Sequence, residues 1–176
     1  MRWLFFILIS LSAVIFQNTV CQLLWFRTPV GWVGPDVLAA VAVFFALFSR
    51  TATDAAINGW VLGFLLDLTI TQPAPPMGLL PLIYAGASIG IFHIRGAFFK
   101  EKVLTQMVMS FLFCLIVYGL WMSWDLAIGR TGSLFDDAVQ LLGFSIYTAI
   151  ITPLVCKILV RFESRLFPVR SLFKKR

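Results

Sequence analysis

The stretch VLTQMVMSFLFCLIVYGLWMSWDLAI, residues 103–128, decides the fold class of this chain, and Asp125 is its single charged residue. A helix rises 1.5 Å per residue, so about 20 apolar residues cross a hydrocarbon core about 30 Å thick. Because the stretch exceeds that length, it predicts a helix that spans a membrane.

Further apolar runs surround this stretch. The six predicted spans cover about residues 3–24, 35–49, 53–71, 78–94, 103–128 and 138–160. The composition agrees, with 60% hydrophobic and 12% charged residues and a mean hydropathy of +0.94, whereas a soluble domain is nearer half apolar and a quarter charged. We therefore predict an all-α integral membrane protein, with a helical bundle over residues 1–160 and a basic cytoplasmic tail over residues 161–176.

The run at 35–49 is the shortest of the six. Its uninterrupted apolar core is Val37–Phe48, and it crosses the bilayer comfortably only if residues 30–34 extend it. Pro35 would then lie near the first turn, where a missing N–H costs least. A five-span alternative treats this run as a re-entrant hairpin.

The positions of the basic residues predict the orientation. With six spans and the N-terminus inside, only Arg27 and Arg130 of the 14 Lys and Arg residues lie outside, as the positive-inside rule requires. Five spans with the N-terminus outside would exchange only Arg2 and Arg27, but Arg2 ahead of a long apolar run favours the first arrangement. The chain is thus predicted to be a multi-pass inner (plasma) membrane protein with both termini cytoplasmic. Because its charges cluster at the ends of apolar runs, we expect no nucleic-acid partner.

The residues that usually carry chemistry are few. Cys21, Cys114 and Cys156 have neither paired nor metal-ligand spacing, and His93 is the single histidine. Since no Ser/His/Asp, Cys/His or His-rich constellation can be assembled from them, we predict no catalytic residue, no cofactor, no metal site and no enzymatic activity.

Small residues recur on one face of the third run. Ala55, Gly59, Gly63 and Asp67 are spaced four residues apart, so they share one side of a helix. The GxxxG of this face lets a neighbouring helix approach closely, and Gly86 and Gly90 repeat the motif in the fourth run. The two motifs predict either a tight hairpin within the chain or, less simply, a dimerisation face.

Two acidic residues lie at the predicted outer ends of membrane helices. Asp36 precedes Val37, where its carboxylate would accept a hydrogen bond from a free N–H of the first helical turn. A carboxylate such as Asp67 costs about 2.5–3.5 kcal/mol near the centre of a membrane helix and less toward its end. Asp67 therefore has either a structural role in the bundle or a functional role in binding a partner or ligand.

Together these stretches resemble the rod shape-determining MreD family. The resemblance is carried by Gly34-Pro35-Asp36-Val37-Leu38, Arg50, residues 59–68 with their G-x-x-x-G-x-x-x-D pattern, Met77-Gly78-Leu79-Leu80 and Tyr84. Size and helix number also fit. The link Pro73-Ala74-Pro75-Pro76 and the long basic tail depart from the family pattern. The residues predicted to serve helix packing or a partner are Pro35, Asp36, Gly59, Gly63, Asp67, Gly78, Gly86 and Gly90.

The resemblance implies a non-enzymatic subunit of the cell-elongation machinery in the bacterial inner membrane. Such a subunit joins MreC and helps to couple MreB filaments to the peptidoglycan polymerase RodA and its partner transpeptidase. The family is similar in fold to the substrate-binding subunits of energy-coupling-factor vitamin transporters, so a vitamin-binding subunit is the alternative. The basic tail suits the anionic cytoplasmic leaflet, as a simple anchor or as a binding segment, through Arg161, Arg165, Arg170, Lys174, Lys175 and Arg176.

Overall fold

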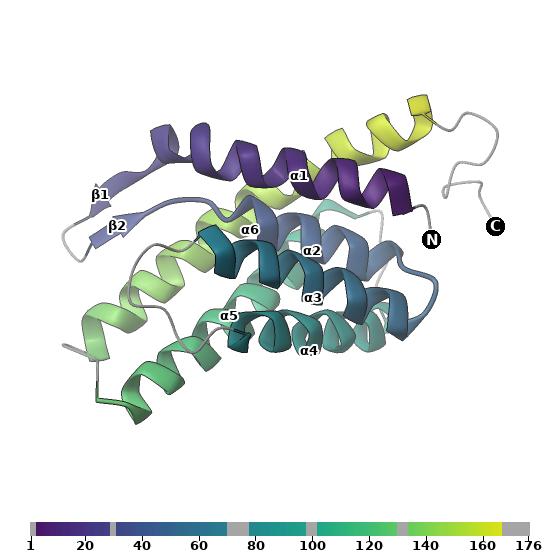
Figure 1. The fold of residues 1–176 in the computed structure, drawn as a ribbon. Coiled ribbons are helices and arrows are strands. Elements are labelled where there is room, and N and C mark those ends of the chain that lie inside the picture. Colours follow the sequence, from purple (N-terminus) through teal and green to yellow (C-terminus); the bar gives the residue numbers. More distant parts are fainter. Residues whose placement is uncertain (1–2, 29–30, 70–77, 98–101, 130–133, 167–176) are drawn as a thin grey trace.

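The computed structural model describes residues 3–28, 31–69, 78–97, 102–129 and 134–166 (Figure 1). Six α-helices form the fold, α1 (Trp3–Thr19), α2 (Val37–Phe48), α3 (Ala52–Thr69), α4 (Leu79–Ile94), α5 (Val103–Ala127) and α6 (Leu134–Leu166). Two short 3-10 helices, η1 (Cys21–Leu24) and η2 (Arg95–Ala97), follow α1 and α4. Strands β1 (Phe26–Thr28) and β2 (Gly31–Val33) pair antiparallel between η1 and α2.

Successive helices run in alternating directions across the bundle (Figure 1). The start of α1 and the end of α6 consequently lie at the same end, on the right in that view. We call this the Arg95 end, because η2 follows α4 there, and we call the opposite end, where α2 begins, the Asp36 end.

Apolar length predicted three helices closely. The spans at 53–71, 78–94 and 103–128 correspond to α3, α4 and α5, with each boundary moved by at most two residues. Helix α6 is longer than predicted and continues to Leu166, into the segment assigned to the tail. Helix α1 is shorter, since it ends at Thr19 and the chain turns into η1.

The region around the second run differs most from the expectation. Residues 31–33 form strand β2 instead of extending α2, which has 12 residues. At 1.5 Å per residue α2 is about 18 Å long, too short to cross a bilayer alone. Pro35 explains the late start, because the residue before a proline is driven away from helical geometry.

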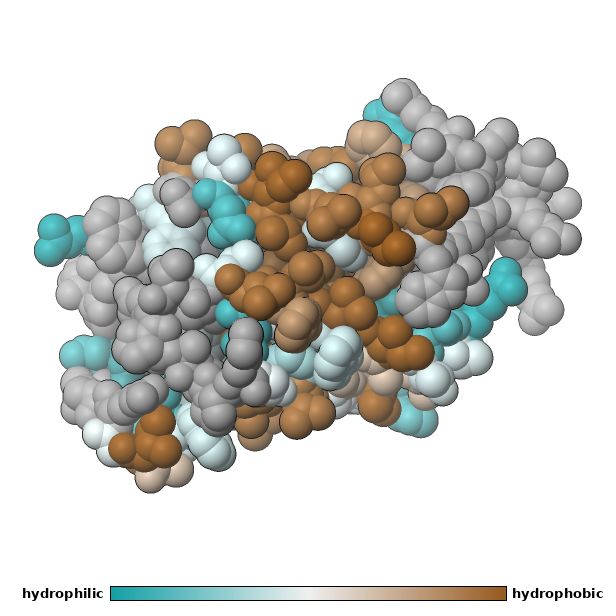
Figure 2. Space-filling view, viewed as in Figure 1, coloured by the Kyte–Doolittle hydropathy of each residue, from teal (hydrophilic) through white to brown (hydrophobic). Residues whose placement is uncertain are grey.

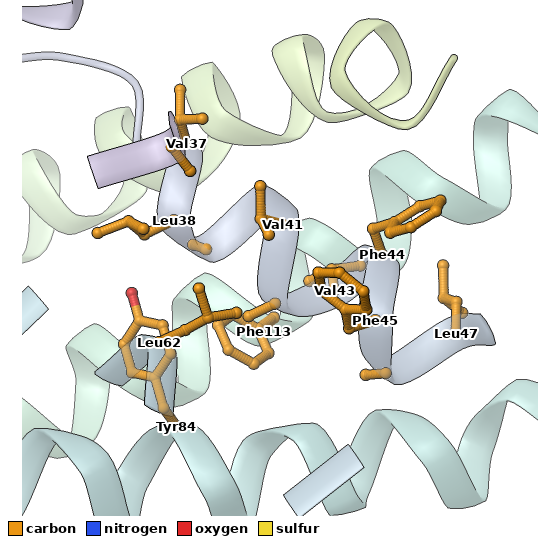
Figure 3. Close-up of a cluster of buried hydrophobic side chains, with 14 of the residues drawn as sticks. Val37, Leu38, Val41, Val43, Phe44, Phe45, Leu47, Leu62, Tyr84 and Phe113 are labelled. Carbon is orange, nitrogen blue, oxygen red and sulfur yellow. The ribbon is translucent and has the colours of Figure 1, made fainter. Parts of the chain in front are cut away.

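Helix α2 occupies the centre of the bundle. Every residue from Val37 to Leu47 is buried, and in Figure 3 its side chains point to several sides, with Leu62, Tyr84 and Phe113 of three other helices packed against them. A helix that is apolar all round is stable only when neighbours cover it on every side. In this fold the second apolar run is therefore a core helix enclosed by the others.

The surface of the surrounding helices is apolar over a wide area. Large hydrophobic side chains are exposed along α1, α5 and α6, among them Leu4, Leu8, Ile15, Leu104, Leu120, Ile150 and Leu154. In Figure 2 hydrophobic side chains gather across the middle of the visible face, with hydrophilic ones toward its two ends. Two of the described helical segments, Val103–Ala127 and Phe135–Phe162, are long and apolar enough to cross a membrane, and most of each is not buried inside the bundle.

Candidate functional site: the Asp36 cluster

Asp36 is the N-cap of the central helix. Its backbone is extended, and its Oδ1 accepts a hydrogen bond from the N–H of Ala39 at 3.0 Å. This contact satisfies one of the amide groups that the first turn of a helix leaves free. The prediction of an N-cap at Asp36 is confirmed.

The other carboxylate oxygen of Asp36 receives two hydroxyl groups. Tyr84 of α4 donates to Oδ2 at 3.0 Å, and Tyr118 of α5 donates to the same atom at 2.6 Å. Asp36 is 3% exposed, so an unmet acceptor here would cost much more than one at a surface. The tyrosine hydroxyls and the positive end of the α2 dipole stabilise the buried carboxylate.

Two more helices reach the same end of α2 through backbone contacts. Gln17 of α1 accepts from the N–H of Val37 at 2.8 Å and donates to the carbonyl of Pro35 at 3.3 Å. The N–H of Asp36 donates to Oγ1 of Thr148 in α6 at 3.0 Å. Helices α1, α2, α4, α5 and α6 thus meet in one hydrogen-bonded group, the Asp36 cluster, formed by Gln17, Asp36, Tyr84, Tyr118 and Thr148.

Buried hydroxyl groups extend from the cluster between α5 and α6. Ser110 and Thr152 share a hydrogen bond of 2.6 Å, and Thr152 donates to the carbonyl of Thr148 at 2.8 Å. Ser145 is also fully buried on α6. Ser110, Thr148 and Thr152 therefore form a buried polar contact between these two apolar helices.

The predicted close contact at Gly59 and Gly63 is confirmed. A Cβ atom added at Gly59 would lie 2.6 Å from the Tyr84 carbonyl oxygen of α4, and one at Gly63 would lie 2.8 Å from Pro81 Cα. Such distances are too short for carbon against backbone, so only glycine allows α3 and α4 to approach this closely. Ala55 and Asp67 are buried on the same face, as their spacing predicted.

The second GxxxG makes no comparable contact within the chain. A Cβ at Gly86 or Gly90 would meet nothing within 4 Å, so the expectation that these two residues contribute to the tight α3–α4 hairpin is wrong. They lie on the side of α4 away from α3, whereas Tyr84 and Ser88 face it. Gly78 has a different role, because its φ of +103° is a left-handed conformation that favours glycine at the start of α4.

Asp67 is joined to the beginning of α4. Its Oδ2 accepts from the N–H of Gly78 at 2.8 Å, and the residue is 7% exposed. The contact fastens the end of α3 to the first turn of α4 and gives Asp67 a structural role. A second role in binding a partner remains a prediction.

Arg95 stabilises the opposite end of α2. Its Nη1 donates to the carbonyls of Ala46, Leu47 and Ser49 at 3.2, 2.8 and 2.6 Å, and its guanidinium lies 3.8 Å from the Phe92 ring centroid. Burial lowers the pKa of Arg95 from its ordinary value. A cation at the C-terminal carbonyls complements the helix dipole, so α2 has a carboxylate at its first turn and a guanidinium at its last.

Gln17, Tyr118, Thr148 and Arg95 were not predicted as site residues. Each is a polar group in or beside an apolar helix. The rule that polar groups of such helices face the bundle interior would have selected them, although it does not say which of them would contact one another.

Among the described residues, no three His, Cys, Asp or Glu side chains gather as a metal site would require.

A shallow groove separates part of α4 from α5. It has a volume of about 300 Å³ and is lined by Leu79, Ile83, Leu120, Ser123, Trp124 and Ala127.

Of the predicted tail residues, Arg161 is exposed at the end of α6. Arg170, Lys174, Lys175 and Arg176 lie outside the described residues, as does the side chain of Arg165.

Several of the residues that carry the MreD resemblance contact one another. Asp36 bonds to Tyr84, Tyr84 packs on Gly59 and Gly63, and Asp67 bonds to Gly78. Comparison of the chain with protein-family models, with curated proteins and with solved structures finds no match.

Proposed function

We propose that this chain is a multi-pass inner-membrane protein of the MreD type, a non-enzymatic subunit of the cell-elongation machinery. In this proposal the chain passes from one side of the bilayer to the other six times, with α2 enclosed by the other helices, and both termini are cytoplasmic. Support comes from the exposed apolar side chains of α1, α5 and α6 together with the buried polar cluster inside. This distribution suits a bundle whose solvent is lipid.

The observation that carries the proposal is that several of the family-like residues contact one another. Pro35 and Asp36, the glycines of α3, Asp67, Gly78 and Tyr84 were selected by their pattern along the sequence. In the folded chain they join α2, α3 and α4 through hydrogen bonds and glycine contacts. Because these residues together join three helices, membership of the MreD family explains their presence better than the chance occurrence of single motifs does.

The polar side chains at the Asp36 end favour a scaffold role over a vitamin-binding role, because they bond to one another. A small-molecule site needs several convergent polar groups facing a cavity. Here the polar side chains at the Asp36 end donate to and accept from one another. A ligand would have to break these bonds, and the α4–α5 groove has an almost entirely apolar lining.

The proposed partners are an MreC-like membrane protein and, through it, MreB, RodA and its transpeptidase.

Depletion of the chain in its rod-shaped host should make the cells round, while uptake of vitamins stays normal. Re-expression of the wild type should restore the rod shape, whereas Gly59→Leu, which separates α3 from α4, should not. Loss of uptake of one vitamin in cells of normal shape would instead identify a transporter subunit.

A further inference from the structure

A short segment at the Asp36 end of the bundle contacts the backbone that leads into the cluster. This strap comprises η1 and β1, residues 21–28. The indole ring of Trp25 lies against Gly34 so closely that a Cβ at position 34 would collide with it. Gly34 precedes Pro35 and Asp36, so the strap rests on the backbone that leads into the central helix.

Aromatic contacts connect the strap to the carboxylate. The rings of Trp25 and Phe144 lie edge to face with centroids 6.1 Å apart, and those of Phe144 and Tyr118 are stacked at 5.8 Å. Tyr118 then donates its hydroxyl to Asp36. Trp25 consequently contacts the Asp36 cluster by two routes, one through Gly34 and one through Phe144.

In the part of the chain that the structure describes, the strap is joined to the bundle by a short strand pair, a hydrogen bond from α6 and the contacts of Trp25. Its strand pairs with one other strand of three residues, and isolated two-stranded hairpins are at best marginally stable. Tyr147 donates to the carbonyl of Leu24 at 3.3 Å, while Leu23 is 84% exposed. Segments with few buried contacts open more readily than the core to which they attach.

We propose that the strap is a latch whose closure, through the seating of Trp25 on Gly34 and Phe144, is coupled to the Asp36–Tyr118 hydrogen bond. When the latch opens, the backbone before α2 loses its cover and Phe144 loses one of its ring neighbours. Any molecule that binds the strap at the surface of the bundle would thereby act on the start of the central helix. This inference does not depend on the proposed function.

Cys21 supplies a direct readout of the latch. It is the first residue of the strap and is fully buried, so a thiol reagent reaches it only when the strap or the helices around it move. Cys114 and Cys156 are buried in the bundle and can be replaced by alanine to leave Cys21 as the single thiol. The rate of modification by a polyethylene-glycol maleimide, measured in mild detergent and in membranes, then reports opening.

Trp25→Ala removes the seated ring and should raise the Cys21 modification rate by about tenfold or more. Gly34→Ala tests the same contact from the other side, because its Cβ would displace the ring. The matched control is Trp60→Ala on α3, which removes another half-exposed tryptophan in ring contact with a phenylalanine and should leave the rate unchanged. An unchanged rate in both Trp25→Ala and Gly34→Ala, or an equal rise in Trp60→Ala, would overturn the latch.

Tyr118→Phe tests the coupling separately. The variant keeps the ring stacked on Phe144 but removes the hydroxyl that reaches Asp36. If closure is coupled to that bond, the Cys21 rate should rise severalfold, at temperatures where the variant is still folded. Ser123→Ala, which removes an exposed hydroxyl one to two turns along the same helix, should not change it. A rate in Tyr118→Phe equal to that of the background protein would show that the strap opens independently of Asp36.

Discussion

Asp36 and the two tyrosines beside it show how one buried charge specifies contacts among several helices. Both carboxylate oxygens are occupied, by one amide and by two hydroxyl hydrogens. A buried hydrogen-bonding group that loses its partner costs about 1–3 kcal/mol. The arrangement therefore penalises any packing in which α4 or α5 rotates its tyrosine away from α2.

Asp36→Asn should destabilise the protein by about 1–3 kcal/mol. Its carboxamide has one acceptor oxygen where the carboxylate has two, so it cannot accept from Ala39 and from both tyrosines. The thermal midpoint in detergent measures the loss. Adding Tyr118→Phe to Asp36→Asn should cost less than Tyr118→Phe alone, because the orphaned hydroxyl is removed. Strictly additive effects would contradict the shared hydrogen bond.

Asp67 should respond differently to the same change. Asp67→Asn retains an oxygen that can accept from the Gly78 N–H, so its effect on thermal stability should be small, whereas Asp67→Leu should lower stability by about 1–3 kcal/mol. If the asparagine variant is stable but no longer recovers its partner, the charge itself serves recognition. A stable leucine variant would show that the bond to α4 contributes little.

At the scale of single elements, α3 and α4 approach each other so closely that glycine is required at the contact. Sequence spacing predicted the face of α3 correctly, since Gly59 and Gly63 are buried against α4. The same motif failed in α4, because a GxxxG on one helix does not require a GxxxG on its partner. Tyr84 and Ser88 supply the surface that the α3 glycines meet.

Alanine substitutions separate the two motifs. Alanine in a helix interior is favoured over glycine by about 1 kcal/mol, so Gly86→Ala and Gly90→Ala should leave thermal stability unchanged or raise it. Gly59→Ala and Gly63→Ala should lower it despite that gain, because their Cβ atoms meet α4 backbone at 2.6–2.9 Å. Unaltered stability in the α3 pair would refute the close contact.

Reduced partner recovery in Gly90→Leu, without loss of stability, would show that the Gly86 and Gly90 face of α4 contacts a partner protein.

At the scale of the whole molecule, the alternating directions of the helices and the positions of the basic residues support the proposed topology. The start of α1 and the end of α6 share an end of the bundle with Arg95, in agreement with the side on which most basic residues were expected. The end of α5 and the start of α6 lie at the other end. In the proposed orientation that end of the bundle faces away from the cytoplasm.

Reporter fusions test the orientation directly. A fusion after Arg176 should report a cytoplasmic location, and one within residues 129–137 should report the opposite compartment, because the positive-inside rule places the basic ends in the cytoplasm. A cytoplasmic signal from the second fusion would exclude both the six-span and the five-span topology. A fusion at Met1 distinguishes these two, since only six spans leave the N-terminus inside.

The sequence by itself determined where most helices lie and which face of α3 packs. Apolar length locates α3, α4 and α5 within two residues, because hydrophobicity along the chain is a local property. The N-cap at Asp36 was also predictable, since a cap depends on residues adjacent in sequence. The hairpin before α2 was missed, as its strands are only three residues long.

Only the tertiary structure decided that the second apolar run is a core helix and that Asp36 is the meeting point of five helices. An apolar run of 12 residues suits a buried helix or part of a span equally well, and the choice depends on which neighbours enclose it. The partners of Asp36 are separated from it by 48, 82 and 112 residues along the chain. No local pattern encodes such distant pairs, because their geometry follows from how the helices pack together.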